Sequence, residues 1–259
     1  MRALTVLYHD VIAADFDESG FPGPAAARYK FKRDEFEAHL EAMRARSTSP
    51  AVATTPAALG VNAQPFFFTI DDGGSSAVYI AAALERIGWR GTFFITTDRI
   101  GSKAFVSAEE IRALHRAGHT IGSHSCSHPY RMAELPHVRL DDEWRRSAAV
   151  LFDILGEKIE TASVPGGFYA PRVAKAASAA GIRVLFNSEP TTRVYREDAC
   201  LIVGRYNVYG GMSAAGAGKL AAADPLELLK QQAIWTIKKT IKTAAAPVWD
   251  QTRKRIFKS

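Results

Sequence analysis

Two histidines lie four residues apart in the segment His124-Ser125-Cys126-Ser127-His128. At this spacing on one helical turn, two imidazoles share a face and can bind a single metal ion. The pair follows a short apolar run and lies among glycine, serine and proline residues, which is typical of a loop at a sheet edge. The spacing alone also fits ordinary turn histidines, so a metal site and a structural loop are both open at this point.

Two adjacent aspartates, Asp71 and Asp72, follow directly on the apolar run 66–70. Neighbouring carboxylates after a buried strand are electrostatically unfavourable unless a ligand or a reaction needs them. The structural alternative is a helix N-cap with a spare acid, because residues 73–75 lead into a predicted helix. The functional alternative is a metal site in which one carboxylate binds the ion and the other stays free as a base.

These side chains follow strand ends in a chain that alternates between strands and helices. Short apolar runs predict strands over 4–8, 66–70, 92–96, 119–122, 161–164, 182–186 and 201–203. Apolar residues spaced three and four apart, with start and stop signals, predict helices over 33–46, 76–87, 107–118, 140–155 and 171–180. Such alternation is typical of a parallel sheet with right-handed crossovers. Periodicity does not choose between an open sheet and a barrel, but polar residues after strand ends are typical of the catalytic rim of an α/β barrel.

Three stretches have no such periodicity. Residues 10–32 are rich in glycine, proline and polar side chains, and residues 47–64 contain no charged residue. We expect both to be loops. The Gly/Ala-rich stretch 212–223 is predicted to be a flexible connector. His39 and His115 lie on predicted amphipathic helices, and we expect them to face solvent.

Taken together, the two polar segments resemble the first two motifs of a known enzyme family. Thr69-Ile70-Asp71-Asp72-Gly73 and His124-Ser125-x-x-His128 are similar to the motifs T-F-D-D-G and H-[ST]-x-x-H of the polysaccharide deacetylase family, also called carbohydrate esterase family 4 or NodB-like. Ile70 replaces the usual phenylalanine. The resemblance implies an α/β fold, a distorted (β/α)7 barrel of the NodB-homology type.

The same resemblance implies roles for individual residues. Asp72, His124 and His128 would bind a divalent metal, usually zinc in this family, and Asp71 would be the general base acting on metal-bound water. Amide hydrolysis fits these residue types, because a metal lowers the pKa of bound water from ~15.7 towards ~7 and a nearby carboxylate can accept a proton.

The later motifs of the family are matched poorly. The third motif reads R-x-P, but here Ser163 stands in place of the arginine. Arg172 or Arg205 would then have to take over the orientation of Asp71, and the N–H of Gly166 would help to bind the oxyanion. The fourth motif is not recognisable. The set expected on the substrate side is Gly166, Phe168, Tyr169, Arg172 and Arg205.

The fifth motif, L-x-H, normally supplies a general acid, but no histidine follows the predicted strand 201–203. The segment Leu7-Tyr8-His9-Asp10-Val11 is similar to the first strand of deacetylases with a permuted motif order. His9 would then protonate the leaving amine, since histidine can donate a proton near neutral pH. The structural alternative is a histidine that caps a barrel strand. We expect Asp10 to cap the following loop.

Charge is distributed unevenly along the 259 residues. The formal charge is +6, but 229–259 contain eight basic residues and one acid, which leaves 25 basic and 26 acidic residues in the first 228. With 47% hydrophobic and 23% charged residues the composition excludes a disordered chain and a coiled coil. We therefore expect a near-neutral barrel over 1–225 and a basic tail over 226–259, with no nucleic-acid partner.

The tail has two interpretations. Ile234, Ile237 and Ile241 have helical spacing, with lysines elsewhere on the wheel. The segment is either a terminal helix packed on the barrel or an amphipathic segment lying on an anionic membrane. The amino terminus lacks the pattern of a secretory signal, and Cys126 and Cys200 are expected to be free thiols, so we expect a cytoplasmic protein that can be peripheral on the inner face of the membrane.

The sequence therefore predicts a metal-dependent hydrolase that removes an N-acyl group, by expectation N-acetyl, from an amino sugar of a polysaccharide or lipid-linked glycan. Asp71 is the predicted base and His9 the predicted acid. Two alternatives stay open: a metal amidase or deformylase with a non-polymeric substrate, and a degenerate carbohydrate-binding relative without catalysis.

Overall fold

The computed structural model describes residues 1–47, 51–60 and 64–237. Within these residues, eight parallel strands and one antiparallel edge strand form a single curled sheet. In their spatial order they are β11 (Tyr206–Asn207), β1 (Leu4–Tyr8), β4 (Phe66–Ile70), β5 (Gly91–Ile95), β6 (Thr120–Ser123), β7 (Thr161–Ser163), β8 (Val184–Phe186), β10 (Cys200–Val203) and β9 (Val194–Glu197).

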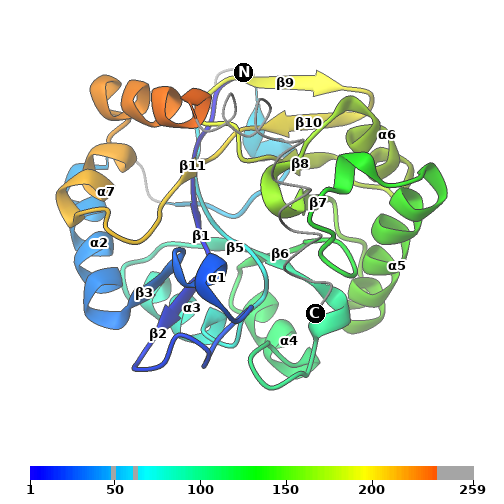
Figure 1. Cartoon of the computed structure of the whole chain (residues 1–259), viewed down its shortest axis with the longest axis horizontal. Helices are drawn as coiled ribbons and strands as arrows, with labels where there is room; N and C mark the ends of the chain where they lie inside the picture. The colour runs from blue at the N-terminus through cyan, green and yellow to red at the C-terminus, as the bar shows by residue number, and fades with distance from the viewer. Residues whose placement is uncertain (48–50, 61–63, 238–259) are drawn as a thin grey trace, which may run out of the picture.

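Helices surround this sheet (Figure 1). They are α1 (Pro24–Ala27), α2 (Arg33–Arg46), α3 (Ala77–Arg86), α4 (Ala108–Arg116), α5 (His137–Leu155), α6 (Pro171–Ala179), α7 (Ala214–Ala221) and a helix over 225–237. Helices α2 and α7 pack together on one side, and α5 and α6 on the other. None of the helices in the described ranges is both long and apolar enough to span a bilayer.

Within the described residues, contacts near the start of β1 join the two sides of the sheet. Arg2 and Arg193 form an antiparallel bridge, and the N–H of Ala3 donates to the carbonyl of Thr192 at 2.9 Å. These contacts join the start of β1 to the chain just before β9. The predicted α/β fold with a distorted barrel is therefore confirmed, and the prediction of seven strands was short by the two-residue β11 and the antiparallel β9.

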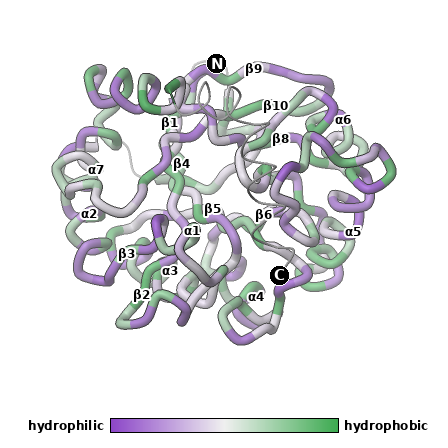
Figure 2. The backbone as a smooth tube through the Cα atoms, in the orientation of Figure 1, coloured by the Kyte–Doolittle hydropathy of each residue, from purple (hydrophilic) through white to green (hydrophobic). Residues whose placement is uncertain are grey.

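The strands are buried on both faces, which explains their continuous apolar runs. Successive side chains of β4 alternate between two cores. Phe66, Phe68 and Ile70 join the large core between sheet and helices, whereas Phe67 joins a smaller core inside the barrel, with Phe94 of β5. In Figure 2 the hydrophobic colour is concentrated on strands such as β4 and β5, and the helices carry both colours.

The parallel register brings the carboxyl ends of the strands to one rim. Tyr8 pairs with Ile70, Ile70 with Phe93, and Ile95 with Ser123. The residues that follow β1, β4 and β6 therefore emerge at the same rim. These residues are His9, the Asp71-Asp72 pair and His124, so the topology gathers the predicted site at the end of the barrel where active sites of α/β barrels lie.

Two sequence expectations about irregular segments were wrong. Residues 10–32 contain β2 (Asp10–Ile12) and β3 (Lys30–Lys32), which pair in parallel, with the short helix α1 between them. The predicted connector 212–223 contains α7, which is capped by the Ser213 hydroxyl and packs on α2. The missing side chain at Gly218 allows this packing, because a Cβ there would lie 2.7 Å from the carbonyl oxygen of Ala42.

His39 is buried rather than solvent-facing. Its Nδ1 lies 3.0 Å from the Tyr8 hydroxyl and its Nε2 lies 3.0 Å from the carbonyl oxygen of Met212. Burial lowers the pKa of His39, so the neutral form is favoured. The helical pattern gave no sign of this, because both partners come from distant segments.

Candidate metal and active site

Three predicted metal ligands meet at the rim of the barrel. Oδ1 of Asp72 lies 3.3 Å from Nε2 of His124 and 3.4 Å from Nε2 of His128. One ligand atom from each of the three residues lies within 4.8 Å of the other two. Two imidazole nitrogens and a carboxylate oxygen form a set typical of a catalytic zinc site, in which a further position stays open for water or substrate.

The chemistry of this cluster fits a cation. Oδ1 of Asp72 is buried and has no hydrogen-bond partner among the described residues. Burial alone would raise the pKa of Asp72, but the close imidazoles of His124 and His128, and the charge of His9, hold it well below its usual range. Burial would lower the pKa of His128, but its contact with Asp72 raises it. A buried, ionised and unpartnered oxygen between two imidazoles is what a metal ion would satisfy.

The second nitrogen of His124 orients its ring. Nδ1 lies 3.1 Å from the backbone carbonyl oxygen of Ser163. A carbonyl oxygen only accepts, so Nδ1 carries a proton, which leaves Nε2, on the side of Asp72, as the nitrogen that could bind a metal ion. Metal-binding histidines commonly have such a partner on the nitrogen that does not bind the metal.

Asp71 contacts Arg205. The two guanidinium nitrogens donate to the two carboxylate oxygens at 2.6 and 2.8 Å, and the Ser163 hydroxyl donates to Oδ2 at 3.2 Å. Burial would raise the pKa of Asp71, but the charges of Arg205 and His124 outweigh it and lower the pKa. Asp71 is therefore a carboxylate at neutral pH, and its Oδ2 lies 3.7 Å from Nε2 of His124.

Arg205 is fully buried inside the barrel. Its Nε donates to the carbonyl of Asn187 at 3.0 Å, and its guanidinium lies 5.6 Å from the ring of Phe94. The sequence left open whether Arg172 or Arg205 orients Asp71, and the structure brings Arg205 to it. Arg172 instead donates to the carbonyl of Ala133 at 3.3 Å from an exposed position.

His9 lies beside both carboxylates. It follows β1, its ring lies 4.6 Å from that of Tyr29 at an angle of 33°, and its charge contributes to the lowered pKa of Asp71 and of Asp72. Nδ1 of His9 is buried without a hydrogen-bond partner in the described part of the chain. The adjacent Asp10 does not contact it, because its Oδ1 accepts from the hydroxyls of Ser19 and Ser76 and so closes the following loop, as expected.

The sequence did not indicate that Phe21 lies beside the candidate metal ligands. The ring of Phe21 lies 4.7 Å from that of His128 and 5.1 Å from that of Phe105. Phe21 belongs to the segment between β2 and β3, which the buried Lys30 holds by donating to the carbonyls of Phe16, Ser19 and Phe21. No periodic signal marks this segment, so only the folded chain shows that it reaches His128.

The residues after β7 form a further part of the rim. Gly166 has a left-handed φ of 64°, and a Cβ there would lie 2.8 Å from the carbonyl oxygen of Tyr130, so glycine is required. The ring of Phe168 lies 5.3 Å from that of Tyr130, which is exposed and follows the His124–His128 loop. Tyr169 instead packs on the large core, where burial raises the pKa of its hydroxyl.

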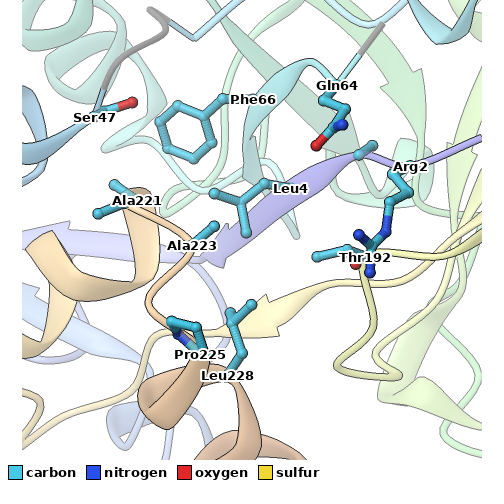
Figure 3. A pocket seen from close by; sticks show the side chains of 12 residues that line it. Arg2, Leu4, Ser47, Gln64, Phe66, Thr192, Ala221, Ala223, Pro225 and Leu228 are labelled. Atoms are coloured by element: carbon cyan, nitrogen blue, oxygen red, sulfur yellow. The ribbon is translucent and has the colours of Figure 1, made fainter. Parts of the chain in front are cut away.

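A cavity of about 450 Å³ lies at the other end of the barrel. It is lined by Arg2 and Leu4 at the start of β1, Phe66 at the start of β4, and Leu228 of the helix over 225–237 (Figure 3). None of the predicted site residues lines it. The cavity is therefore separate from the candidate active site, which follows the opposite ends of the same strands.

Comparisons with known proteins agree with this arrangement. A family model described as polysaccharide deacetylase matches residues 60–185, whereas no curated protein sequence matches the chain. Three solved structures share its fold. They are a polysaccharide deacetylase from Bacillus cereus (TM-score 0.69, 16% identity, 85% of this chain and 69% of that one), a deacetylase from Streptococcus pyogenes in complex with acetate (0.65, 17%, 83% and 95%) and IcaB from Ammonifex degensii (0.66, 20%, 85% and 97%).

The matched segment runs from before β4 to within β8, and it contains both carboxylates and both histidines of the cluster. The solved structures, at these identities, support the fold, and the family model supports the chemistry of the motifs. The resemblance seen in two short motifs thus extends over a continuous part of the chain and over its topology. Over residues 60–185 the chain therefore matches the polysaccharide deacetylase family in sequence, and over most of its length it has the fold of the solved deacetylases.

Proposed function

We propose that this protein is a metal-dependent N-deacetylase that removes an acyl group, by expectation acetyl, from an amino sugar. The match to the polysaccharide deacetylase family model supports the removal of N-acetyl groups from a polysaccharide. The metal and the roles of single residues rest on the rim geometry. The observation that carries the proposal is Oδ1 of Asp72, buried without a hydrogen-bond partner in the described chain and within 3.4 Å of two imidazole nitrogens.

Asp72, His124 and His128 would hold the ion. A divalent metal supplies Lewis-acid chemistry, lowering the pKa of water and polarising the acyl oxygen. Nδ1–H of His124 donates to the Ser163 carbonyl, which keeps its ring in the binding orientation. Imidazole and carboxylate ligands are consistent with zinc, as the family resemblance implies.

Asp71 would accept the proton of the attacking water. Its carboxylate lies beside the metal ligands, and Arg205 holds it in one orientation. A carboxylate with two fixed guanidinium contacts cannot rotate freely, so an incoming water meets an ionised oxygen of defined direction.

His9 would donate a proton to the leaving amine. Its buried Nδ1 lacks a hydrogen-bond partner within the described residues, which supports a role in proton transfer. Protonation of the nitrogen is required because an amine anion is a poor leaving group, and a positioned imidazole contributes roughly 10²–10⁴-fold to such steps. The substrate side would be formed by Gly166 and by Phe168, whose ring pairs with Tyr130 and can pack against a sugar face.

The test is acetate release from an N-acetylglucosamine oligomer by the purified full chain loaded with zinc. We expect release by the wild type and loss of release in Asp71→Asn, with zinc binding retained. Surface substitution Glu109→Gln on α4 is the matched control for loss of a carboxylate. Equal release by wild type and Asp71→Asn would contradict the role of Asp71.

We also propose that the basic tail brings a cytoplasmic protein to the inner face of a membrane. In the described part of the tail, Leu226, Leu229 and Ile237 are 77%, 60% and 59% exposed along one helix face, whereas Glu227 and Gln231 are buried against the barrel. Residues 238–259, which lie outside the described residues, add seven basic side chains and one acid. An exposed apolar face followed by basic residues supports binding to anionic lipid.

This second proposal has its own test. We expect the full chain to sediment with vesicles that contain phosphatidylserine, and Leu226→Gln/Leu229→Gln to sediment less while zinc binding stays unchanged. Vesicles of neutral lipid are the control. Equal sedimentation with both lipids, or no effect of the double substitution, would contradict membrane binding through this face.

A further inference from the structure

We propose that Glu143, a residue of α5 that the motifs do not include, is a positioning residue for the metal-binding loop 124–128. The inference rests on the proposed metal site, since its role is to keep His124 and His128 in the geometry that binds the ion. If Glu143 holds the loop in this way, a change at Glu143 alters metal affinity although Glu143 is not itself a ligand.

Both carboxylate oxygens of Glu143 accept hydrogen bonds from the loop. Oε2 accepts from the backbone N–H of Cys126 at 3.0 Å and of Ser127 at 2.9 Å, and Oε1 accepts from the Ser127 hydroxyl at 2.5 Å. Glu143 is 2% exposed. All three bonds go to the oxygens of one buried carboxyl group, and hydrogen bonds in a buried place are electrostatically stronger than in water.

The loop needs such support because its backbone is strained. Ser125 and His128 have φ values of +63° and +58°, in the left-handed region that residues with a side chain rarely adopt. The residues bonded by Glu143 lie between these two positions. Strained conformations persist only where surrounding contacts impose them. Because one of the strained residues is itself a proposed ligand, loss of the support would move the imidazole of His128 directly.

Backbone hydrogen bonds from the other side of the loop add to this support. The N–H groups of Thr97 and Asp98, at the short 3-10 helix that follows β5, donate to the carbonyl oxygens of Ser125 and Cys126 at 3.2 and 3.0 Å. Loop carbonyls are thus bonded towards β5, while loop N–H groups are bonded towards α5. A loop held on both sides has one arrangement, which is what a preformed metal site requires.

The composition of α5 supports a role beyond packing. Its buried residues are Leu140, Glu143, Trp144, Ser147 and Leu151, and both of the polar ones contact the end of β6 or its loop. Ser147 lies 2.6 Å from the Ser123 hydroxyl, which in turn accepts from the N–H of Ser125. An apolar residue at position 143 would suit a core helix better, because a buried carboxylate must lose its hydration.

The experiment compares zinc affinity in Glu143→Gln, in the wild type and in Asp142→Asn, all as the full chain. Asp142 is the neighbour on the same helix, is exposed and pairs with Arg146 on the surface. Affinity is measured by competition with a chromophoric chelator, and circular dichroism reports whether each variant is folded. We expect Glu143→Gln to bind zinc about 10–100-fold more weakly, the usual effect of losing a partner that orients ligands, and Asp142→Asn to match the wild type.

A milder variant covers the case in which Glu143→Gln does not fold. Ser127→Ala removes only the hydroxyl contact to Oε1, so we expect it to fold and to bind zinc more weakly than the wild type but more tightly than Glu143→Gln. Wild-type affinity in a folded Glu143→Gln, or in Ser127→Ala when the first variant is unfolded, would overturn the positioning role alone. Absence of zinc binding in the wild type would overturn the proposed metal function together with it.

Discussion

Arg205 and Asp71 form a two-bond ion pair inside the barrel, with nitrogen–oxygen distances of 2.6 and 2.8 Å. The two residues are 134 positions apart, one directly after β4 and the other just after β10. Ser163, which stands where the family motif has its arginine, lies between them and accepts from Nη2 of Arg205 at 2.7 Å. The arginine that orients Asp71 therefore follows β10, whereas the family motif places it at the end of β7. The contact between an arginine and the proposed base is the same.

This pair predicts the behaviour of Arg205→Met. Removal of the guanidinium leaves Asp71 buried without its main partner, which typically costs about 3–5 kcal/mol of unfolding free energy. Arg205→Lys keeps the charge but not the two parallel bonds, so we expect an intermediate stability and a reduced kcat. Urea unfolding and acetate release measure the two effects. An Arg205→Met protein as stable as the wild type would show that the pair has no net stabilising role.

Acid stability follows from the same pair. The pKa of Asp71 is lower in the folded protein than in the unfolded chain, so its stabilisation is present above the unfolded value of about 3.9 and is lost as pH falls through the lowered pKa. Arg205→Met removes the main cause of the lowered pKa, so the difference in stability between the wild type and this variant should shrink as pH falls through this range. Urea midpoints at several acid pH values test this, and parallel curves for the two proteins would contradict it.

His128 predicts the opposite pH dependence for the metal-free protein. Its pKa is raised in the fold, so the contribution of its contact with Asp72 is complete below the unfolded value of about 6.5 and is lost as pH rises through the raised pKa. Zinc needs the neutral imidazole, so zinc affinity should rise over the same range. Chelator competition from about pH 6 to 8 measures the affinity, and a flat profile would contradict a raised pKa at this ligand.

We expect substitution of His9 to reduce turnover without reducing metal binding. His9→Gln removes the proposed proton donor, and we expect kcat to fall by roughly 10²–10⁴-fold while zinc binding is unchanged. A variant with the wild-type kcat would assign His9 to packing against Tyr29, whose ring lies 4.6 Å away.

Phe21 predicts an effect on substrate binding that depends on Lys30. The ring of Phe21 covers His128, and the ammonium of Lys30 fixes the carbonyl of Phe21 at 2.8 Å. Phe21→Ala should raise KM with zinc affinity nearly unchanged, and Lys30→Met should have the same effect through the loosened segment, together with lower stability. Steady-state kinetics separate these results from a fall in kcat alone, which would place Phe21 outside the substrate wall.

Features that depend on neighbouring residues in the chain could be predicted from the sequence, whereas contacts between distant segments could not. Asp72, His124 and His128 were found because short motifs mark them, and the barrel was found because buried strands and amphipathic helices alternate. Contacts between distant segments leave no such signal. The sequence left Arg172 and Arg205 as the two candidates to orient Asp71, but the choice between them depends on the closed sheet. The contacts of Glu143 with the loop depend on it too, and no local pattern of charge or hydrophobicity indicates them.

Two misread segments show the same limit. His39 has the spacing of an exposed helix residue, but Tyr8 and the Met212 carbonyl meet it from other parts of the chain. The Gly/Ala-rich α7 has low intrinsic helix propensity at its glycines, yet Gly218 lets it approach the backbone of α2 closely. Tertiary packing decided both, so local propensity gave the wrong prediction.

The most direct test of the central claim is removal and return of the metal. The full chain is stripped with a chelator, and acetate release from an N-acetylglucosamine oligomer is followed while zinc is added back. We predict no release without metal and full release near one zinc per chain, with no recovery in Asp72→Asn. Unchanged release by the stripped protein, or equal recovery in Asp72→Asn, would contradict a metal held by Asp72, His124 and His128.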